Sequence, residues 1–225
     1  MEFYAVITGD IINSSDLGAE RRQKLLDSLK EAFQKITENV LNEKENPFEI
    51  YRGDSFQAKI KNSQLAIFIG IIIRAKIRSL NYEIYRAGRV SVGNLNDARI
   101  AVGIGKIDFA ASKTIESDGE AFKFSGELIE KMKREKRALM VRTPWLEVNS
   151  ELEVECLLVD QIISDWSFSQ AEVVYEILLG DKIQSSLAKK IGISQPAVSK
   201  RITSAKIEGI NLFINRYKEL IGSKI

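Results

Sequence analysis

The stretch FEIYRGDSFQAKI, residues 48–60, decides the fold that we expect for this chain. Residues 48–51 and 56–60 alternate between apolar and polar side chains, and Gly53-Asp54 lies between them. This pattern predicts two antiparallel strands joined by a tight turn. Asp54 is either a turn residue alone or a carboxylate that the hairpin tip holds in place to bind a ligand.

Segments on both sides extend this hairpin into a sheet with helices. Apolar runs and periodicity predict strands over residues 3–7, 99–104 and 138–142, and helices over residues 20–42, 65–77 and 119–134. The composition of residues 99–104 indicates burial on both faces, and the isoleucine-rich middle of residues 65–77 is also compatible with a strand. Loops are expected over residues 86–97 and 109–118. The order β-α-β-β-α-β-α-β predicts an α+β fold with a split-βαβ, ferredoxin-like sheet and helices on one face.

The chain changes character after Pro144, where the strand patterns stop. Helical patterns follow over residues 152–165, 170–179, 185–191, 195–205 and 207–221. We therefore expect an α/β domain over residues 1–148, a connecting helix over residues 149–168 and an all-α helix-turn-helix domain over residues 169–225.

Composition limits the chemistry and the location. The 225 residues include no histidine, which excludes Ser-His and Cys-His catalysis and His-ligated zinc. Any metal must then bind carboxylates and carbonyls, ligands that favour Mg²⁺, Mn²⁺ or Ca²⁺. The single Cys156 forms no internal disulfide, the first residues lack a signal-peptide pattern, and the apolar run 65–73 is too short to span a bilayer. We expect a cytoplasmic protein that does not enter a membrane.

The segment SSLAKKIGISQPAVSKRI, residues 185–202, predicts two short helices joined by a tight turn. Gly192 can take a positive φ and end the first helix, Ser194 is a good N-cap, and Pro196 falls in the first turn of the second helix. The inward-facing residues are apolar: Leu187, Ala188, Ile191, Ala197, Val198 and Ile202. This is the pattern of a helix-turn-helix. The segment resembles the helix-turn-helix of bacterial regulators and the promoter-reading region of sigma factors.

The outward side of this segment carries the candidate DNA contacts. Polar and basic side chains there are Lys189, Lys190, Gln195, Ser199, Lys200, Arg201 and Thr203, with Lys206 close by. Gln195 and Ser199 lie near the helix start that meets base edges, and the basic residues can neutralise phosphates. Basic residues also outnumber acidic ones over residues 166–225, whereas the reverse holds before them. DNA is therefore the expected partner, and a homodimer is expected because one such motif buries little DNA surface. The alternative is a motif kept only for packing or dimerisation.

A second candidate site involves Asp10, which follows the first predicted strand in ITGDIINSS. In a split-βαβ sheet this strand lies beside the hairpin, so Asp10 and Asp54 can be neighbours. Two close carboxylates repel by roughly 1 kcal/mol in water, which a bound Mg²⁺ or Mn²⁺ would offset. The alternatives are a helix cap for Asp10 and a simple turn residue for Asp54.

A nucleotide-type ligand at such a metal would meet five further residues. These cofactor-binding candidates are Gly9, Ile11, Arg52, Gly53 and Lys106. Both glycines would let the backbone approach phosphates closely. Arg52 and Lys106 would contact phosphates, or they are simply solvated charges at strand ends.

Four segments resemble class III nucleotide cyclases in the order in which that family carries them. ITGDIINSS resembles the first metal-binding segment, YRGDSF the hairpin with the second metal Asp, RIAVGIGKI the following strand, and DGEAFKFSGEL the start of the last conserved helix. The resemblance implies a palm-like domain with Asp10 and Asp54 as metal ligands. Lys123 and Glu127 stand where cyclases carry an Asn and an Arg, and a Glu there would oppose catalysis.

The whole chain resembles the SatD family of bacterial proteins. The matching segments are YAVITGDI, GDSFQ, RIAVGIG, DGEAF and the SQxxVSK tail. Two functions follow as hypotheses. The first is a DNA-binding transcriptional regulator whose palm-like domain senses a metal-nucleotide ligand or dimerises the protein. The alternative is a metal-dependent nucleotidyl cyclase-like or phosphoryl-transfer enzyme with a regulatory helix-turn-helix tail.

Overall fold

The computed structural model describes residues 2–12, 14, 17–51, 53–80, 96–109, 118–181 and 183–225. Arg52 and most of the two predicted loops lie outside the described residues. Asp97, which we expected in a loop, is the first residue of a strand.

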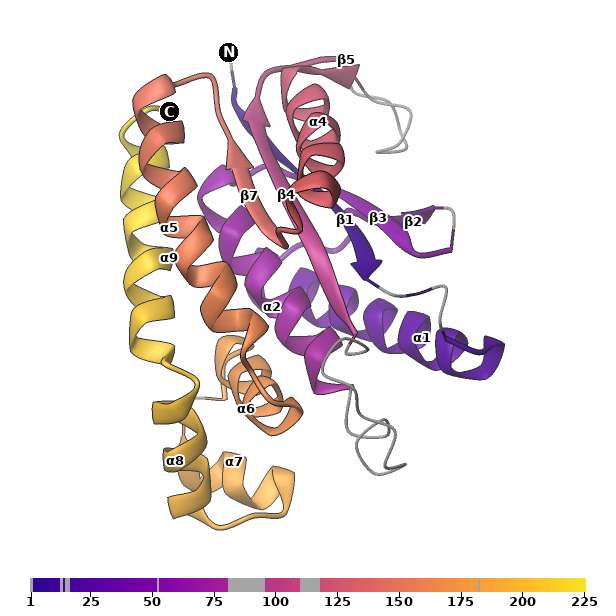
Figure 1. Ribbon diagram of the computed structural model, residues 1–225, viewed down its shortest axis with the longest axis vertical. Helices are drawn as coiled ribbons and strands as arrows, with labels where there is room; N and C mark the ends of the chain where they lie inside the picture. The colour runs from indigo at the N-terminus through magenta and orange to yellow at the C-terminus, as the bar shows by residue number, and fades with distance from the viewer. Residues whose placement is uncertain are drawn as a thin grey trace.

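A five-stranded sheet forms the centre of the fold (Figure 1). Its order is β2 (Phe48–Tyr51), β3 (Ser55–Ile60), β1 (Tyr4–Ile12), β4 (Asp97–Gly105) and β7 (Leu139–Arg142). β1 runs antiparallel to both β3 and β4, and β4 runs parallel to β7. The short strands β5 (Ile107–Phe109) and β6 (Asp118–Gly119) pair separately. The α+β class is confirmed, and the chain order of β1 to β4 is that of a split βαβ unit.

Helices cover both faces of the sheet, so the expected arrangement on one face is wrong. α1 (Ala19–Ile36, continued by the π-helix Thr37–Leu41) and α2 (Ala66–Ser79) share one hydrophobic cluster with the sheet. α4 (Glu120–Glu135) forms a second cluster, in which Ala101 of β4 meets Leu128 and Met132. β4 alternates between the two clusters, which explains why its sequence is apolar throughout.

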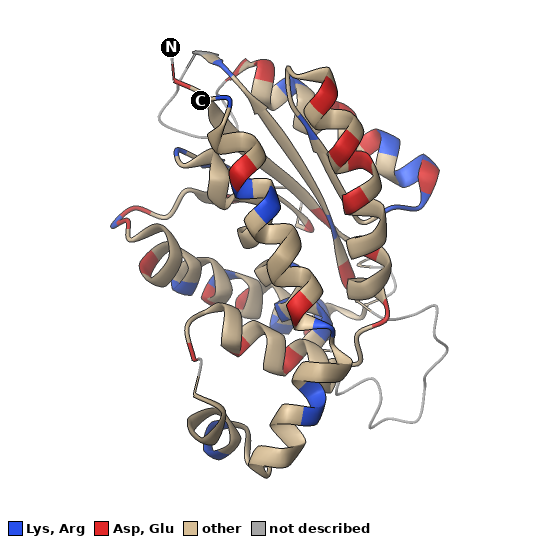
Figure 2. Cartoon of the chain, turned by 90° about the vertical axis from the view of Figure 1, so that its left-hand side faces the viewer, with Lys and Arg blue, Asp and Glu red and all other residues tan. Residues whose placement is uncertain are grey.

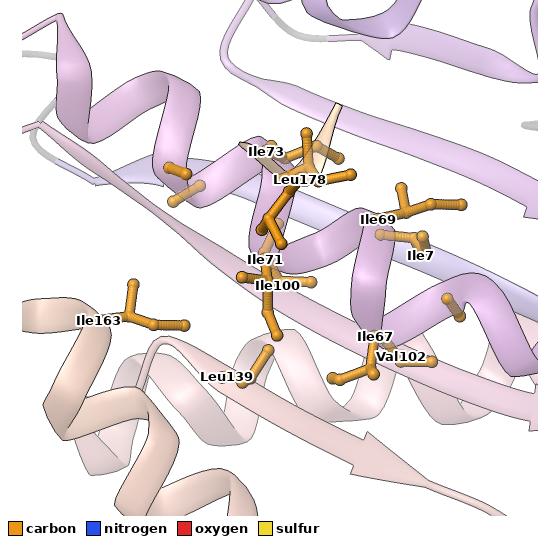
Figure 3. Packing of buried hydrophobic residues seen from close by; sticks show 14 of the residues in the cluster. Ile7, Ile67, Ile69, Ile71, Ile73, Ile100, Val102, Leu139, Ile163 and Leu178 are labelled. Atoms are coloured by element: carbon orange, nitrogen blue, oxygen red, sulfur yellow. The ribbon is translucent and has the colours of Figure 1, made fainter. Parts of the chain in front are cut away.

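The isoleucine-rich segment is a helix, not a strand, and it is the most buried helix of the described chain. Eleven residues of α2 are buried. Figure 3 shows its isoleucines meeting side chains of β1, β4 and β7. A helix that is apolar nearly all round must be covered on several sides. The sheet, α1 and α6 provide this cover.

The C-terminal helices agree with the predicted ones in order and type. They are α5 (Leu146–Ser164), α6 (Phe168–Leu178), α7 (Gln184–Ile191), α8 (Gln195–Ser204) and α9 (Ile207–Gly222). α5 begins six residues before the predicted start, and α9 returns alongside it (Figure 1). The hydroxyl of Tyr217 on α9 donates to the carbonyl of Ser63 at 3.0 Å, which ties the end of the chain to the N-terminal half.

α6 belongs to two hydrophobic clusters. Ala171, Val174 and Leu178 lie in the main core with the sheet. Val173 lies in a smaller cluster with Leu187 and Ala188 of α7 and Val198 of α8. We call α6, α7 and α8 the three-helix unit.

A buried charge network joins α2, β4 and α5. Arg74, which is 0% exposed, donates to both carboxylate oxygens of Asp97 at 3.0 and 2.7 Å and to Asp160 at 2.7 Å. Arg78 donates to Asp97 at 2.9 Å and to the carbonyls of Ser164 and Trp166. Asp160 also accepts from the backbone N–H of Ala138 at 2.7 Å. Two guanidinium groups balance two carboxylates, so each buried charge has an opposite partner.

Across the described ranges, no helix combines the length and apolar character needed to cross a membrane.

Candidate functional site

Asp10 and Asp54 lie on neighbouring strands at one end of the sheet, which we call the acidic end. Asp10 pairs with Ser55 across β1 and β3, and the N–H of Ile11 donates to the carbonyl of Asp54 at 3.0 Å. Asp10 lies inside β1 and the N-cap of α1 is Gly18, so Asp10 does not cap a helix. Asp54 does lie in the turn, after Gly53, whose φ of 77° favours glycine.

Two cations surround the Asp10 carboxylate. Arg99, its partner across β1 and β4, places Nη1 3.3 Å from both carboxylate oxygens. Lys133 of α4 places Nζ 3.8 Å from Oδ2. The Asp10 side chain is only 14% exposed. The carboxylate is therefore neutralised by the chain itself.

Asp54 has a hydroxyl partner. The Ser14 hydroxyl donates to Oδ2 at 2.6 Å. Because this bond joins the segment after β1 to the hairpin tip, Asp54 has a structural task there, as a turn residue that holds a neighbouring segment.

Arg99 already engages the Asp10 carboxylate in this arrangement, and a two-carboxylate Mg²⁺ or Mn²⁺ site at the acidic end stays a prediction. A divalent ion on Asp10 would have to share both oxygens with the Arg99 guanidinium. In the part of the chain that the structure describes, no group of three or more His, Cys, Asp or Glu side chains is placed to hold a metal. The side-chain cations of Arg99 and Lys133 already offset the negative charge that a bound metal ion would otherwise neutralise.

Of the five cofactor-binding candidates, Gly9, Ile11 and Gly53 lie beside Asp10 or Asp54 at the acidic end, whereas Lys106 does not. A Cβ on Gly9 would lie 2.2 Å from the Phe56 ring, and Ile11 is 4% exposed, so both serve the core. Lys106 follows Gly105, which pairs with Tyr4 at the far end of β1 from Asp10. Six residues of strand separate these ends by about 20 Å. Gly53 lies in the turn beside Asp54, and Arg52 lies outside the described residues.

Lys123 and Glu127 are exposed on α4. Glu127 accepts from Arg142 of β7 at 2.6 Å, and the Arg142 guanidinium lies 4.7 Å from the Phe124 ring centroid. Glu127 thus has a surface ion pair with the neighbouring strand.

The outward surface of α7 and α8 gathers the candidate DNA contacts. Gly192 has φ 74° and ends α7, and the Ser194 hydroxyl accepts from the N–H of Ala197 at 3.4 Å. The side chains of Lys189, Gln195, Ser199, Lys200 and Thr203 are exposed. Figure 2 shows basic segments and no acidic ones on these two helices.

Two of the candidate DNA contacts already have acidic partners on α6. Lys190 donates to Glu176 at 2.5 Å, and Arg201 donates to Glu172 at 3.3 Å. Burial raises the pKa of Glu172, although Arg201 opposes this shift. Within the described chain, no ion pair engages Lys189 or Lys200, so these two are the best placed to meet phosphates.

Sequence reasoning missed Arg99 and Lys133, the residues that decide the chemistry of Asp10. Arg99 was visible as a strand residue, but only the register of β1 against β4 places it opposite Asp10. Lys133 comes from α4, whose position on the opposite face from α2 was not expected. Sequence reasoning also missed a series of hydrogen bonds between polar side chains nearby. Gln57 donates to Thr8, and Thr8 donates to Ser125 of α4 at 2.9 Å.

The fold defines an α+β protein in which a split-βαβ sheet is followed by a helical C-terminal segment. The family model described as SatD family matches residues 4–220, and the chain belongs to this family. Comparison with curated proteins gave no match, and comparison with solved structures gave none.

Proposed function

We propose that this SatD-family protein is a DNA-binding transcriptional regulator in which α7, the turn after it and α8 form a helix-turn-helix. The observation that carries the proposal is the orientation of α8. Its apolar residue Val198 is buried against α6 and α7, while Ser199, Lys200 and Thr203 are exposed. A helix held from behind with a polar outward face is what major-groove recognition requires.

The charge distribution supports the same partner. Residues 183–207 contain basic side chains and no Asp or Glu. Lys189 at the end of α7 and Lys200 on α8 would contact phosphates on either side of a groove, and these contacts position the protein without reading sequence. Gln195 at the start of α8 would reach base edges, because its amide can donate and accept.

The same geometry gives the sheet a role as a scaffold. α6 is packed on α2. Trp166, which belongs to the main core, donates from Nε1 to the carbonyl of Ala205 at 2.9 Å, so the end of α8 is held against that core. We expect the active species to be a homodimer, since paired motifs read half-sites one helical turn apart. The cyclase-like alternative has no support at the acidic end, where Arg99 and Lys133 occupy the Asp10 carboxylate.

Replacing Lys200 by alanine is expected to weaken binding to duplex DNA of any sequence. One lost phosphate contact reduces the slope of log affinity against log salt by about 0.9. The measurement is fluorescence anisotropy with a labelled random-sequence 30-base-pair duplex at several salt concentrations, and Lys189→Ala should behave in the same way.

Lys61→Ala is the matched control. Lys61 is exposed but follows β3, on the N-terminal part of the fold, and its loss should leave the slope unchanged. Equal slopes for the parent protein, Lys189→Ala and Lys200→Ala would rule out phosphate contacts through α7 and α8.

A further inference from the structure

A cleft of about 880 Å³ lies between the N-terminal half and the three-helix unit. α1 supplies Arg21, Leu25 and Ser28, and the end of α2 supplies Lys76. The other wall includes Phe168 and Tyr175 of α6, Ile191 and Ile193 around the α7–α8 turn, and Arg201. This volume lies within the range of small-molecule sites, roughly 300–1,000 Å³. It is distinct from the acidic end of the sheet and from the outward face of α8.

One wall of the cleft holds a buried hydroxyl that lacks a partner. Tyr175 is 3% exposed, and its hydroxyl has no hydrogen-bond partner among the residues that the structure describes. An unsatisfied buried polar group costs about 1–3 kcal/mol. Proteins rarely keep such a group unless something else binds it.

A lysine lies beside this tyrosine. Lys76 Nζ lies 5.1 Å from the centroid of the Tyr175 ring. Within the described chain, no carboxylate lies within ion-pair distance of Lys76. Burial lowers the pKa of Lys76, whereas Glu31 and Glu176 raise it from farther away. The ammonium group is therefore partly desolvated without a direct counter-charge.

The remaining charges of the cleft are largely paired. Glu172 binds Arg201, Glu176 binds Lys190, and Asp27 lies 3.9 Å from Lys30. Lys24 lies 3.4 Å from Glu20. Among the described residues that line the cleft, the charges without an ion pair are Lys76, which is half-buried in the wall, and Arg21 at the exposed rim. Between them the lining is apolar, from Leu25, Phe168 and Ile193.

We propose that this cleft binds a small organic anion with an apolar or aromatic body. Lys76 would hold the anionic group, the Tyr175 hydroxyl would donate to it, and the body would lie against the leucine, phenylalanine and isoleucine side chains. The ligand would touch α1 and α2 on one side and the turn between α7 and α8 on the other. Where the proposed DNA-binding function holds, such a ligand is an effector, because it favours one orientation of α8 over others. The ligand then changes the affinity of the protein for DNA, and DNA changes the affinity of the protein for the ligand by the same factor.

A pair of fluorescent probes tests the site on the full-length protein. 8-Anilinonaphthalene-1-sulfonate carries an aromatic body and a sulfonate, and N-phenyl-1-naphthylamine has the same body without the charge. We expect saturable binding of one sulfonate probe per chain, at least tenfold tighter than the neutral probe, because a charge-assisted hydrogen bond is involved. Lys76→Met should remove this preference for the anion.

Lys218→Met is the matched control. Lys218 Nζ lies 5.5 Å from the centroid of the Phe68 ring, a similar cation–π contact that does not line the cleft. This variant should bind both probes as the parent does. Ser28→Trp, which fills the cleft from α1, should abolish binding of both probes. Tyr175→Phe should raise Tm, since it removes an unsatisfied hydroxyl, and should weaken only the sulfonate probe.

Equal affinity for the two probes, or sulfonate binding that survives both Lys76→Met and Ser28→Trp, would overturn the proposal. The effector role has its own readout, the affinity for the labelled duplex with and without saturating sulfonate probe. Protein that binds the probe but no DNA would contradict the proposed function and leave the cleft site standing. Protein that binds DNA but shows no anion preference would contradict the cleft site alone.

Discussion

Replacing Asp160 by alanine is expected to lower the free energy of unfolding by about 3–5 kcal/mol. Asp160 accepts from Arg74, whose side chain is 0% exposed, and from the N–H of Ala138. The substitution leaves a buried guanidinium and a buried N–H without this partner, and an uncompensated buried charge is among the most destabilising defects. Urea unfolding followed by circular dichroism measures the change.

The control for Asp160→Ala is Glu151→Ala. Glu151 binds Arg216 with two hydrogen bonds at 2.7 and 3.2 Å, but both side chains are substantially exposed. An exposed pair contributes about 0–1 kcal/mol. If Asp160→Ala cost no more than Glu151→Ala, the network between α2, β4 and α5 would not hold these elements together.

The same network predicts acid sensitivity. Burial alone would raise the pKa of Asp97, but Arg74 and Arg78 lower it below its ordinary value. Because the pKa is lower in the folded chain than in the unfolded one, this stabilisation is complete above the ordinary carboxyl pKa of about 4. It is lost as the pH falls through the lower folded value. The urea concentration at the unfolding midpoint, measured from pH 7 downward, should therefore decrease once the pH is below about 4. Asp97→Asn should make this midpoint depend less on pH.

Replacing Gly103 by alanine is expected to cost about 1–3 kcal/mol or more. A Cβ at this position would lie 2.2 Å from the carbonyl oxygen of Ala121 and 2.6 Å from the backbone nitrogen of Ser125. Both atoms belong to the backbone of α4, so no side-chain rotation relieves the contact. The helix has to move away from β4, which also disturbs the bond between Thr8 and Ser125. Thermal unfolding of the variant measures the loss.

Gly126, which follows Ser125 on α4, provides the control. It is exposed, and a Cβ there would meet nothing within 4 Å. Alanine is the better helix former by about 0.8–1.0 kcal/mol, so Gly126→Ala should raise Tm. A Gly103→Ala variant as stable as the parent would contradict the close approach of α4 to β4.

Local signals were sufficient for most elements of the fold. Gly53 marked the hairpin, Gly192 and Ser194 marked the turn before α8, and period-two and helical patterns gave the order of strands and helices, because these features depend on nearby residues alone. The side of the sheet taken by α4 was not a local property. It depends on Gly103, whose missing side chain admits the helix on the face opposite to α2.

The candidate site was less predictable for the same reason. That Asp10 and Asp54 approach the same end of the sheet followed from connectivity. Their chemistry depends on Arg99 and Lys133, which lie 89 and 123 residues beyond Asp10 and reach it only through strand register and helix placement. The cleft beside Tyr175 has no sequence signature, since its walls come from segments that meet only in the folded chain.

The double membership of α6 limits how this protein can be divided. Its Ala171 and Val174 complete the core around the sheet, whereas Val173, on another side of the same helix, completes the cluster of α7 and α8. A fragment beginning after α6 would lack Val173 from its own interior. A fragment beginning before α6 would expose to water the surface of α6 that α2 now covers. The last sixty residues are therefore not expected to keep their packing when they are separated from the rest of the chain. Any graft of α7 and α8 onto another carrier must supply a substitute for α6 with two apolar sides.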